Sequence, residues 1–178
     1  MGTGQTLMTI LALGLLGALF LSNNRSTLDQ RQSIESAQWE IMASSLATSL
    51  VEKATSLSFD QNTVSGDISN PSSLTGVSSL GPEGSAETTG ANRESKFNDI
   101  DDYNGFGKDV SGDSLAIGGT GSAAFHVWSR VQYVSIVGTH IDSSSTRTYH
   151  KRLTVWVSSP SMSDTVTYQS VYSYWYFR

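Results

Sequence analysis

The chain has 178 residues, a formal net charge of −5 at pH 7 and no cysteine. Disulfides and thiol chemistry are therefore excluded, and the acidic balance offers no basic surface that would attract nucleic acid. A chain of this length holds one domain with an appendage, or one elongated unit, but not two full domains.

An uninterrupted apolar run extends from Leu7 to Leu21 without a charged residue. As a helix, residues 1–22 would measure about 33 Å, which is just enough to cross a bilayer. Because only about 15 of these residues are continuously apolar and membrane spans usually need about 20, the segment is a marginal anchor. Three interpretations follow: a cleaved secretory signal, a membrane anchor, or a helix that is first held in the membrane and later buried among copies of the same chain. The first is disfavoured because residues 1–9 contain no Lys or Arg and no typical cleavage site follows the run.

Small residues divide this apolar run. Gly14 and Gly17 are three positions apart, and Ala12 and Ala18 lie beside them. Helices approach one another closely at such positions. The pattern favours packing against other helices over contact with lipid alone.

The helical pattern continues after residues 23–25. Apolar residues recur at spacings of three, four or their sums: Leu28, Ile34, Ala37, Ile41, Leu46, Leu50, Ala54 and Leu57. Because no proline precedes Pro71, we predict one helix from Thr3 to Leu57, about 80 Å long. Residues 59–178 cannot cover so long a helix, so part of its apolar surface needs a membrane or other chains.

The predicted organisation is a helix over residues 1–58 and a β-rich head over residues 59–178. Within the head, residues 59–96 are rich in Ser and Gly and include Pro71 and Pro82. This composition is typical of a connector. We expect it to be exposed and to contain at most one short strand.

An acidic segment after the connector is a candidate Ca²⁺ loop. Hard cations prefer several carboxylate and carbonyl oxygens, and Asp99, Asp101, Asp102 and Asn104 supply them. The EF-hand spacing is not met, because Tyr103 takes a ligand position. A turn in which Asp and Asn accept hydrogen bonds from backbone amides is the favoured interpretation, so no metal is predicted.

Three runs rich in Val, Thr and aromatic residues predict strands at residues 125–137, 148–158 and 165–177. In the second run, Leu153, Val155 and Val157 alternate with polar or larger residues, which indicates one buried face. Turn residues at 142–145 and 159–164 favour an antiparallel meander. The predicted fold class is α+β, with the C-terminal half of the long helix packed on an antiparallel sheet.

Charge is unevenly distributed along the head. Residues 83–113 contain eight acids and three bases, whereas residues 125–178 contain two acids and five bases. If both regions are exposed, neighbouring heads present complementary faces, and their association weakens with salt.

The sequence does not predict an enzyme or a cofactor. His126, His140 and His150 lack the spacing of metal ligands, and no nucleophile-elbow sequence is present. The Gly-rich stretch 118–121 lacks the lysine of a phosphate loop.

The chain begins with a distinctive motif: residues 4–9 read Gly-Gln-Thr-Leu-Met-Thr and precede the apolar residues 10–17. This motif resembles the N-terminus of type IV pilins and the related pseudopilins. In that family a glycine precedes a Thr-Leu-hydrophobic-Glu sequence and a long apolar helix, and here Thr9 stands in place of the glutamate. Residues 97–106 are similar to an Asp-Asp-aromatic-Asn-Gly segment of pilin-like heads, and residues 151–155 and 172–175 resemble their closing strands.

The resemblance implies a structural subunit, the major pilin, of an extracellular type IV pilus-like filament on the bacterial surface. Its partners would be copies of itself, prepilin peptidase and the assembly machinery, and before assembly it would reside in the cytoplasmic membrane. Cleavage after Gly4 would make Gln5 the mature N-terminus, with Met1 as the alternative. Residues expected in the filament core are Gln5, Leu7, Thr9, Leu11, Gly14, Leu15, Gly17, Leu19 and Phe20.

Two alternatives remain open. One is a minor pilin or a type II secretion pseudopilin, which uses the same helix in a short tip or piston. The other is a monomeric, membrane-anchored surface protein whose aromatic sheet binds a ligand. Replacing Gly14 with a bulky residue distinguishes a filament subunit from a monomeric anchor. Loss of the polymer by a protein that still folds and is exported indicates a filament subunit, and unchanged behaviour indicates a monomeric anchor.

Overall fold

The computed structural model describes residues 2–90, 92–111 and 124–176. The chain divides into two compact units, residues 1–39 and 40–178. The long helix α1, Thr3–Thr55, forms the first unit and contributes its last turns to the second. The sequence places the boundary at 58/59, whereas the head unit begins at Glu40 because these last turns carry apolar side chains that are buried in the head.

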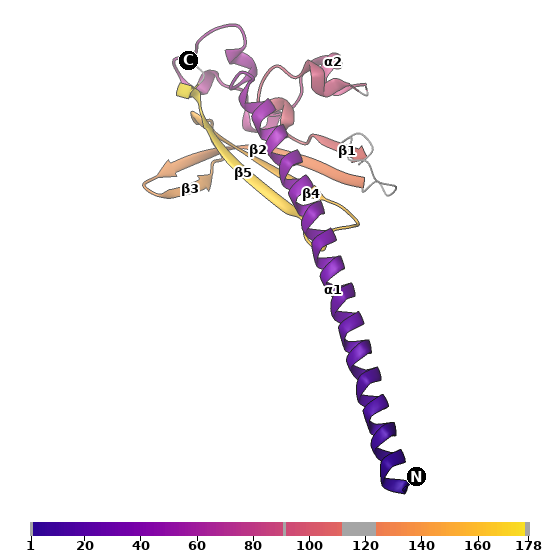
Figure 1. Ribbon diagram of the computed structural model, residues 1–178. Helices are drawn as coiled ribbons and strands as arrows, with labels where there is room; N and C mark the ends of the chain where they lie inside the picture. Colours follow the sequence, from indigo (N-terminus) through magenta and orange to yellow (C-terminus); the bar gives the residue numbers. More distant parts are fainter. Residues whose placement is uncertain (1, 91, 112–123, 177–178) are drawn as a thin grey trace. The chain divides into compact units, whose positions relative to one another are not determined.

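The head unit is a helix-on-sheet structure (Figure 1). Its elements are the last turns of α1, the short helix α2 (Gly84–Thr88) and strands β1 (Gly107–Ser111), β2 (Ala124–Val137), β3 (His140–Ser143), β4 (His150–Ser158) and β5 (Val166–Ser173). Short 3₁₀ turns lie at Gln61–Thr63, Pro71–Ser73, Val77–Ser79, Arg93–Lys96, Asp101–Tyr103 and Tyr174–Tyr176. The predicted α+β class is confirmed.

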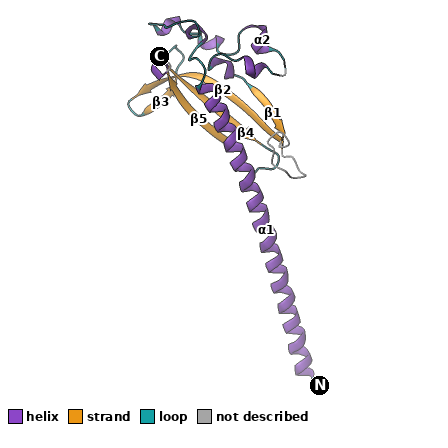
Figure 2. Cartoon of the chain, turned by 45° about the horizontal axis from the view of Figure 1, so that its top comes forward, coloured by secondary structure: helices purple, strands orange, loops and turns teal. Residues whose placement is uncertain are grey.

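The sheet is antiparallel, with strand order β1-β2-β4-β5, and β3 pairs with the end of β2 (Figure 2). β2 and β3 are joined by two residues, and Gly138 of this turn has φ +62°, a conformation that favours glycine. Strands β2, β4 and β5 correspond to the three predicted runs. β1 and β3 were not predicted, because their short sequences form strands only by pairing with β2.

Residues at alternate positions of β2 and β4 face the core. Cross-strand partners on this face include Val127 with Val157 and Val131 with Leu153, all buried. The last turns of α1 contribute Ala43, Ala47, Leu50, Val51 and Ala54, which are also buried. Small alanines at this spacing let the helix backbone lie close to the sheet. The predicted packing of the C-terminal half of the helix on one sheet face is thus confirmed.

The connector is less exposed than the sequence predicts. Phe59, Asp60 and Leu74 are buried, and the described residues of 59–92 form 3₁₀ turns and the short helix α2 but no strand. The last strand also ends earlier than predicted, at Ser173. There the Tyr174 N–H donates to the carbonyl of Tyr149 at 2.9 Å, and the Tyr174 hydroxyl accepts from the N–H of Ile68 at 2.9 Å. The chain continues as a 3₁₀ turn over Tyr174–Tyr176; Phe177 lies outside the described residues.

Glu94 joins α1 to β1. Its carboxylate accepts hydrogen bonds from Lys53 of α1 at 2.9 Å and Lys108 of β1 at 3.0 Å. Burial raises the pKa of Glu94, but the hydrogen bonds and charges of the two lysines outweigh this effect, so its pKa lies below the ordinary value of 4.5. The ionised form is therefore the one that the folded head stabilises.

We expect Glu94→Gln to lower the free energy of unfolding by about 0.5–1 kcal/mol at pH 7, because both lysines are partly exposed. A lowered folded-state pKa contributes stability above pH 4.5 that is lost as the pH falls through the folded value. The difference from wild type should therefore shrink below pH 4.5 and disappear near pH 2. Urea unfolding across this range measures it, with the exposed Glu52→Gln as control; a loss that stays constant down to pH 2 would contradict the ion-pair explanation.

Candidate functional site

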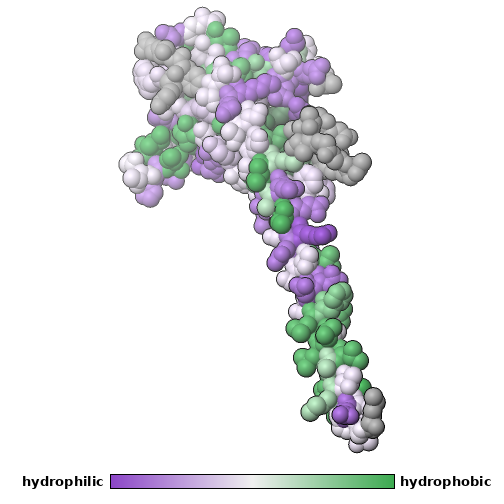
Figure 3. Space-filling view, viewed as in Figure 1, coloured by the Kyte–Doolittle hydropathy of each residue, from purple (hydrophilic) through white to green (hydrophobic). Residues whose placement is uncertain are grey.

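The N-terminal segment of α1 carries a continuous apolar surface, which Figure 3 shows in green. Ten large apolar side chains are between 60% exposed (Leu11) and 76% exposed (Met8): Leu7, Met8, Ile10, Leu11, Leu13, Leu15, Leu16, Leu19, Phe20 and Leu21. This helix is long and apolar enough to cross a membrane, and no part of its apolar window is buried. We refer to residues 7–21 as the apolar segment.

All nine residues predicted for a filament core lie on α1 at or near the apolar segment, and all are exposed. The structure places them along one rod and does not gather them into a pocket. A Cβ atom added at Gly14 or Gly17 would meet nothing within 4 Å. The single chain therefore has no packing reason for glycine at these positions, although glycine costs about 0.8–1 kcal/mol relative to alanine in a helix.

The polar residues near the start of α1 satisfy their hydroxyl groups within the helix. Thr9 Oγ1 donates to the carbonyl of Gln5 at 2.8 Å, and Thr6 Oγ1 donates to the carbonyl of Thr3 at 2.9 Å. A hydroxyl that is already hydrogen-bonded can enter an apolar environment at small cost. Thr9 is thus compatible with burial of this part of the helix.

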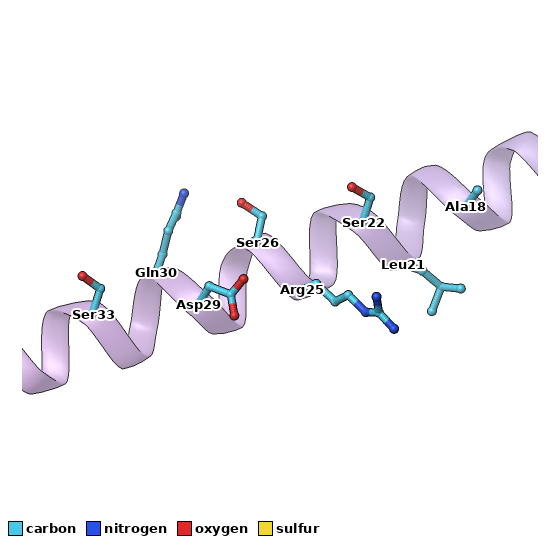
Figure 4. Close-up of a pocket in the computed structure, with 8 residues that line it drawn as sticks. All are labelled: Ala18, Leu21, Ser22, Arg25, Ser26, Asp29, Gln30 and Ser33. Atoms are coloured by element: carbon cyan, nitrogen blue, oxygen red, sulfur yellow. The ribbon is translucent and has the colours of Figure 1, made fainter. Parts of the chain in front are cut away.

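A shallow hollow on α1 is not a ligand site. Its lining residues all belong to one stretch of helix: Ala18, Leu21, Ser22, Arg25, Ser26, Asp29, Gln30 and Ser33 (Figure 4). Their side chains project to different sides of a single rod, so the hollow has no opposite wall. Small-molecule sites need concave surfaces that enclose most of the ligand.

In the structure, the four candidate cation ligands do not all lie together. The Asn104 side chain is used by the backbone, because its Oδ1 accepts from the N–H of Val131 at 3.1 Å and its Nδ2 donates to the carbonyl of Leu80 at 2.8 Å. Asp101 pairs with Lys151 at 2.5 Å. Asp99 and Asp102 remain together, and Glu83 joins them. Of the four candidate ligands, Asp101 and Asn104 are therefore engaged with other partners.

Lys151 is the centre of a buried polar cluster in the head. The side chains of Lys151, Asp60 and Asp101 are completely buried. Lys151 Nζ donates to Asp60 Oδ2 at 2.7 Å, to Asp101 Oδ1 at 2.5 Å and to the carbonyl of Phe59 at 2.9 Å. One ammonium group on β4 thereby joins the residues that follow α1 to the turn at 101–103.

The two carboxylates of this cluster differ in their other partners. Asp60 accepts from the N–H groups of Asn62 and Thr75 at 3.0 Å, and the Tyr133 hydroxyl lies 3.1 Å away. Burial raises the pKa of Asp60, but the charge of Lys151 and these hydrogen bonds outweigh it, so the pKa is below its ordinary value. Burial raises the pKa of Asp101 to about 7, despite Lys151. The positive charge of Lys151 and the hydrogen bonds therefore outweigh the effect of burial on the pKa of Asp60 but not on that of Asp101.

Burial also changes the predicted distribution of charge. Glu87, Asp99, Asp101 and Asp102 are buried, and so is Lys151, while Asp113 and Arg178 lie outside the described residues. The prediction that these regions expose complementary charges is therefore wrong for these five groups, because they are buried. Of the acids that the structure describes in residues 83–111, only Glu83, Glu94 and Asp109 reach the surface.

The histidines have separate local partners. His126 Nδ1 lies 2.6 Å from Asp109 Oδ1 on the exposed edge of β1 and β2, and His150 Nδ1 lies 2.7 Å from Ser173 Oγ. His140 is exposed in β3. The Gly-rich stretch 118–121 lies outside the described residues.

Sequence reasoning missed Lys151, Asp60 and Glu83. A signal for Lys151 was present, because it occupies the same strand face as the predicted inward residues Leu153, Val155 and Val157. A lysine on a buried strand face requires a partner. No comparable local pattern marks Asp60 or Glu83.

Comparison with known proteins gives no match: no family model, no functionally characterised protein and no solved structure resembles the chain significantly.

Proposed function

We propose that this chain is a structural subunit, the major pilin, of an extracellular type IV pilus-like filament. The observation that carries the proposal is the apolar segment, whose ten large side chains have no cover in the single chain. Burying a side chain of this size contributes about 1.5–3 kcal/mol, so their exposure to water is strongly unfavourable. The head has its own core, to which the apolar segment contributes no buried side chain.

In this proposal the apolar segment lies in the cytoplasmic membrane before assembly and among identical helices afterwards. Prepilin peptidase and the assembly machinery act on the chain between these two states. Leu7, Leu11, Leu15, Leu19 and Phe20 exchange lipid contacts for protein contacts. Gly14 and Gly17 allow neighbouring helices to approach closely, which explains glycines that the single chain does not require. The β-rich head forms the outer layer.

Thr9 occupies the position of the family's glutamate. A carboxylate buried in an apolar core must be paired with a cation. Thr9 is uncharged, and its hydroxyl already donates to the carbonyl of Gln5. It therefore introduces no unpaired charge into the core.

One observation favours a monomeric surface binding protein as a second candidate. Trp128 and Trp156 stack at 5.9 Å between ring centroids on the sheet face that α1 does not cover, and both are half-buried. Aromatic platforms of this kind bind ligands, but cross-strand packing also explains them. A minor pilin or a secretion pseudopilin is a third candidate and differs from the major pilin in abundance and polymer length.

Substituting leucine for Gly14 tests the polymer. The new side chain meets nothing within 4 Å in the single chain, and leucine is a better helix former than glycine, so the subunit should fold and reach the membrane. We expect Gly14→Leu to reduce filaments at least tenfold in surface material sheared from the producing cells, as counted by electron microscopy. Gly66→Leu in the connector, which also meets nothing within 4 Å, is the matched control and should leave filaments intact.

N-terminal sequencing of the sheared material distinguishes Met1 from Gln5 as the mature first residue. Long filaments composed mainly of this chain identify a major pilin, and trace amounts within filaments of another subunit identify a minor one. Filaments that are unaffected by Gly14→Leu, or cells that carry the folded protein only as a membrane-anchored monomer, would refute the proposal.

A further inference from the structure

Three carboxylates converge in the head. Glu83 lies in the loop that leads into α2, and Asp99 and Asp102 lie on either side of the start of the 101–103 turn. One carboxylate oxygen from each residue lies within 4.8 Å of the other two. Asp99 and Asp102 are completely buried, and Glu83 is half-buried.

Hydrogen bonds account for only part of this cluster. Asp99 Oδ1 accepts from the N–H of Asp101 at 2.6 Å, and Asp102 Oδ2 accepts from the N–H of Asn98 at 2.8 Å. Three other oxygens, Asp99 Oδ2, Asp102 Oδ1 and Glu83 Oε2, are buried and accept no hydrogen bond. The neighbouring Asn98 Oδ1 is also buried without a donor. Buried carboxylate oxygens without partners are rare in folded proteins and costly.

No basic side chain compensates these charges within the part of the chain that the structure describes. The ion pairs of the head use Glu94, Asp109, Asp60 and Asp101, and none includes a member of this cluster. Burial and the charges of Asp101 and Asp102 raise the pKa of Asp99 to about 9. Burial and the charges of Asp102 and Glu87 raise the pKa of Glu83 to about 7. The arrangement therefore lacks a positive charge.

We propose that Glu83, Asp99 and Asp102 bind a Ca²⁺ ion. All three donors are hard oxygens, and no His or Cys belongs to the group, which excludes a typical zinc site. Oxygens on opposite sides of Ca²⁺ lie about 4.6–5.2 Å apart, whereas around Mg²⁺ they lie about 4.0–4.2 Å apart. The three oxygens lie within 4.8 Å of one another, which is compatible with a shared Ca²⁺. The ion would join the loop before α2 to the turn at 101–103.

The test is calcium titration of the full-length protein in detergent micelles after removal of bound metal with EDTA. We expect isothermal titration with CaCl₂ to give one site per chain. At 100-fold excess over the dissociation constant, Ca²⁺ should raise the unfolding midpoint of the head by about 5–10 °C. MgCl₂ should bind at least tenfold more weakly.

Isosteric variants separate binding from folding. Asp99→Asn and Asp102→Asn keep an oxygen acceptor for their backbone donors but remove one negative charge. In EDTA they should unfold at or above the wild-type midpoint, and they should bind Ca²⁺ at least 100-fold more weakly. Asp109→Asn, an exposed acid on β1, is the matched control and should bind Ca²⁺ as wild type does. Glu83→Gln, at the half-exposed rim, provides a third variant if a buried one fails to fold.

The proposal is overturned if wild-type protein gives no binding heat and its unfolding midpoint is the same in EDTA and in Ca²⁺. An unfolding midpoint that varies with pH but not with Ca²⁺ would also overturn it, because protons rather than a cation would then neutralise the cluster. Equal Ca²⁺ binding by wild type and by foldable variants of all three ligands would have the same consequence.

Discussion

Replacement of Lys151 by methionine should destabilise the head by about 3–5 kcal/mol, the largest effect that we expect for a single substitution in this chain. Methionine has a similar length, but it removes the ammonium that lies 2.7 Å from Asp60 and 2.5 Å from Asp101. Two completely buried carboxylates then lose their only cation among the described residues. Since domains of this size are stable by about 5–15 kcal/mol, a large share of the stability would be lost.

Urea unfolding, followed by tryptophan fluorescence of the full-length protein in detergent, measures this loss. Lys108→Met is the matched control, because Lys108 pairs with Glu94 at the surface and should cost no more than about 1 kcal/mol. The triple variant Lys151→Met, Asp60→Asn, Asp101→Asn should recover part of the stability, because the two carboxylates that Lys151 pairs with are then no longer charged. A Lys151→Met protein as stable as the Lys108→Met protein would contradict the buried-charge explanation.

Removal of residues 1–29 should convert the protein into a monomer that is soluble without detergent. The ten exposed side chains of the apolar segment represent on the order of 15–30 kcal/mol of burial free energy, which only a membrane or other chains can supply. No described residue before Ala43 is buried in the single chain. The shortened protein should therefore keep the wild-type free energy of unfolding within about 0.5 kcal/mol.

Size-exclusion chromatography with light scattering, together with thermal unfolding of both proteins in the same detergent, tests both parts of this expectation. When detergent is removed, the full-length chain should elute as large assemblies or precipitate, whereas the shortened chain should elute as a monomer. A full-length chain that stays monomeric in plain buffer would show that its apolar segment finds cover within the molecule. An unfolded shortened chain would show that the head depends on the first half of α1.

Some strands could be predicted from their own sequence, whereas others form only through pairing with a neighbouring strand. β2 and β4 were predictable because their buried and less buried residues alternate with period two, and the pattern needs no partner to be recognised. β1, with the sequence Gly-Lys-Asp-Val-Ser, has no such pattern and is a strand because it pairs with β2 from Gly107↔Trp128 to Ser111↔Ala124. β3 likewise depends on the tight turn at Gly138.

The acidic segment shows why the candidate sites were harder to predict. The sequence places Asp99, Asp101, Asp102 and Asn104 next to one another, but each side chain selects its partner from a different part of the head. Asp101 meets Lys151, 50 residues away, and Asn104 meets Leu80 and Val131. Glu83 joins Asp99 and Asp102 only because the loop before α2 folds over the turn. Proximity in sequence therefore grouped Asp99 with Asp102, but it did not predict the partners of Asp101 and Asn104 or the approach of Glu83.

The sequence by itself determined the long helix, the three main strands and the uncovered apolar segment. Each follows from a repeating pattern or a continuous apolar run, which acts through local backbone geometry and contact with water. Only the tertiary structure decided which charges are buried, which are paired and which converge. These properties depend on contacts between residues up to 92 positions apart, such as Lys151 and Phe59, and no local pattern encodes such contacts.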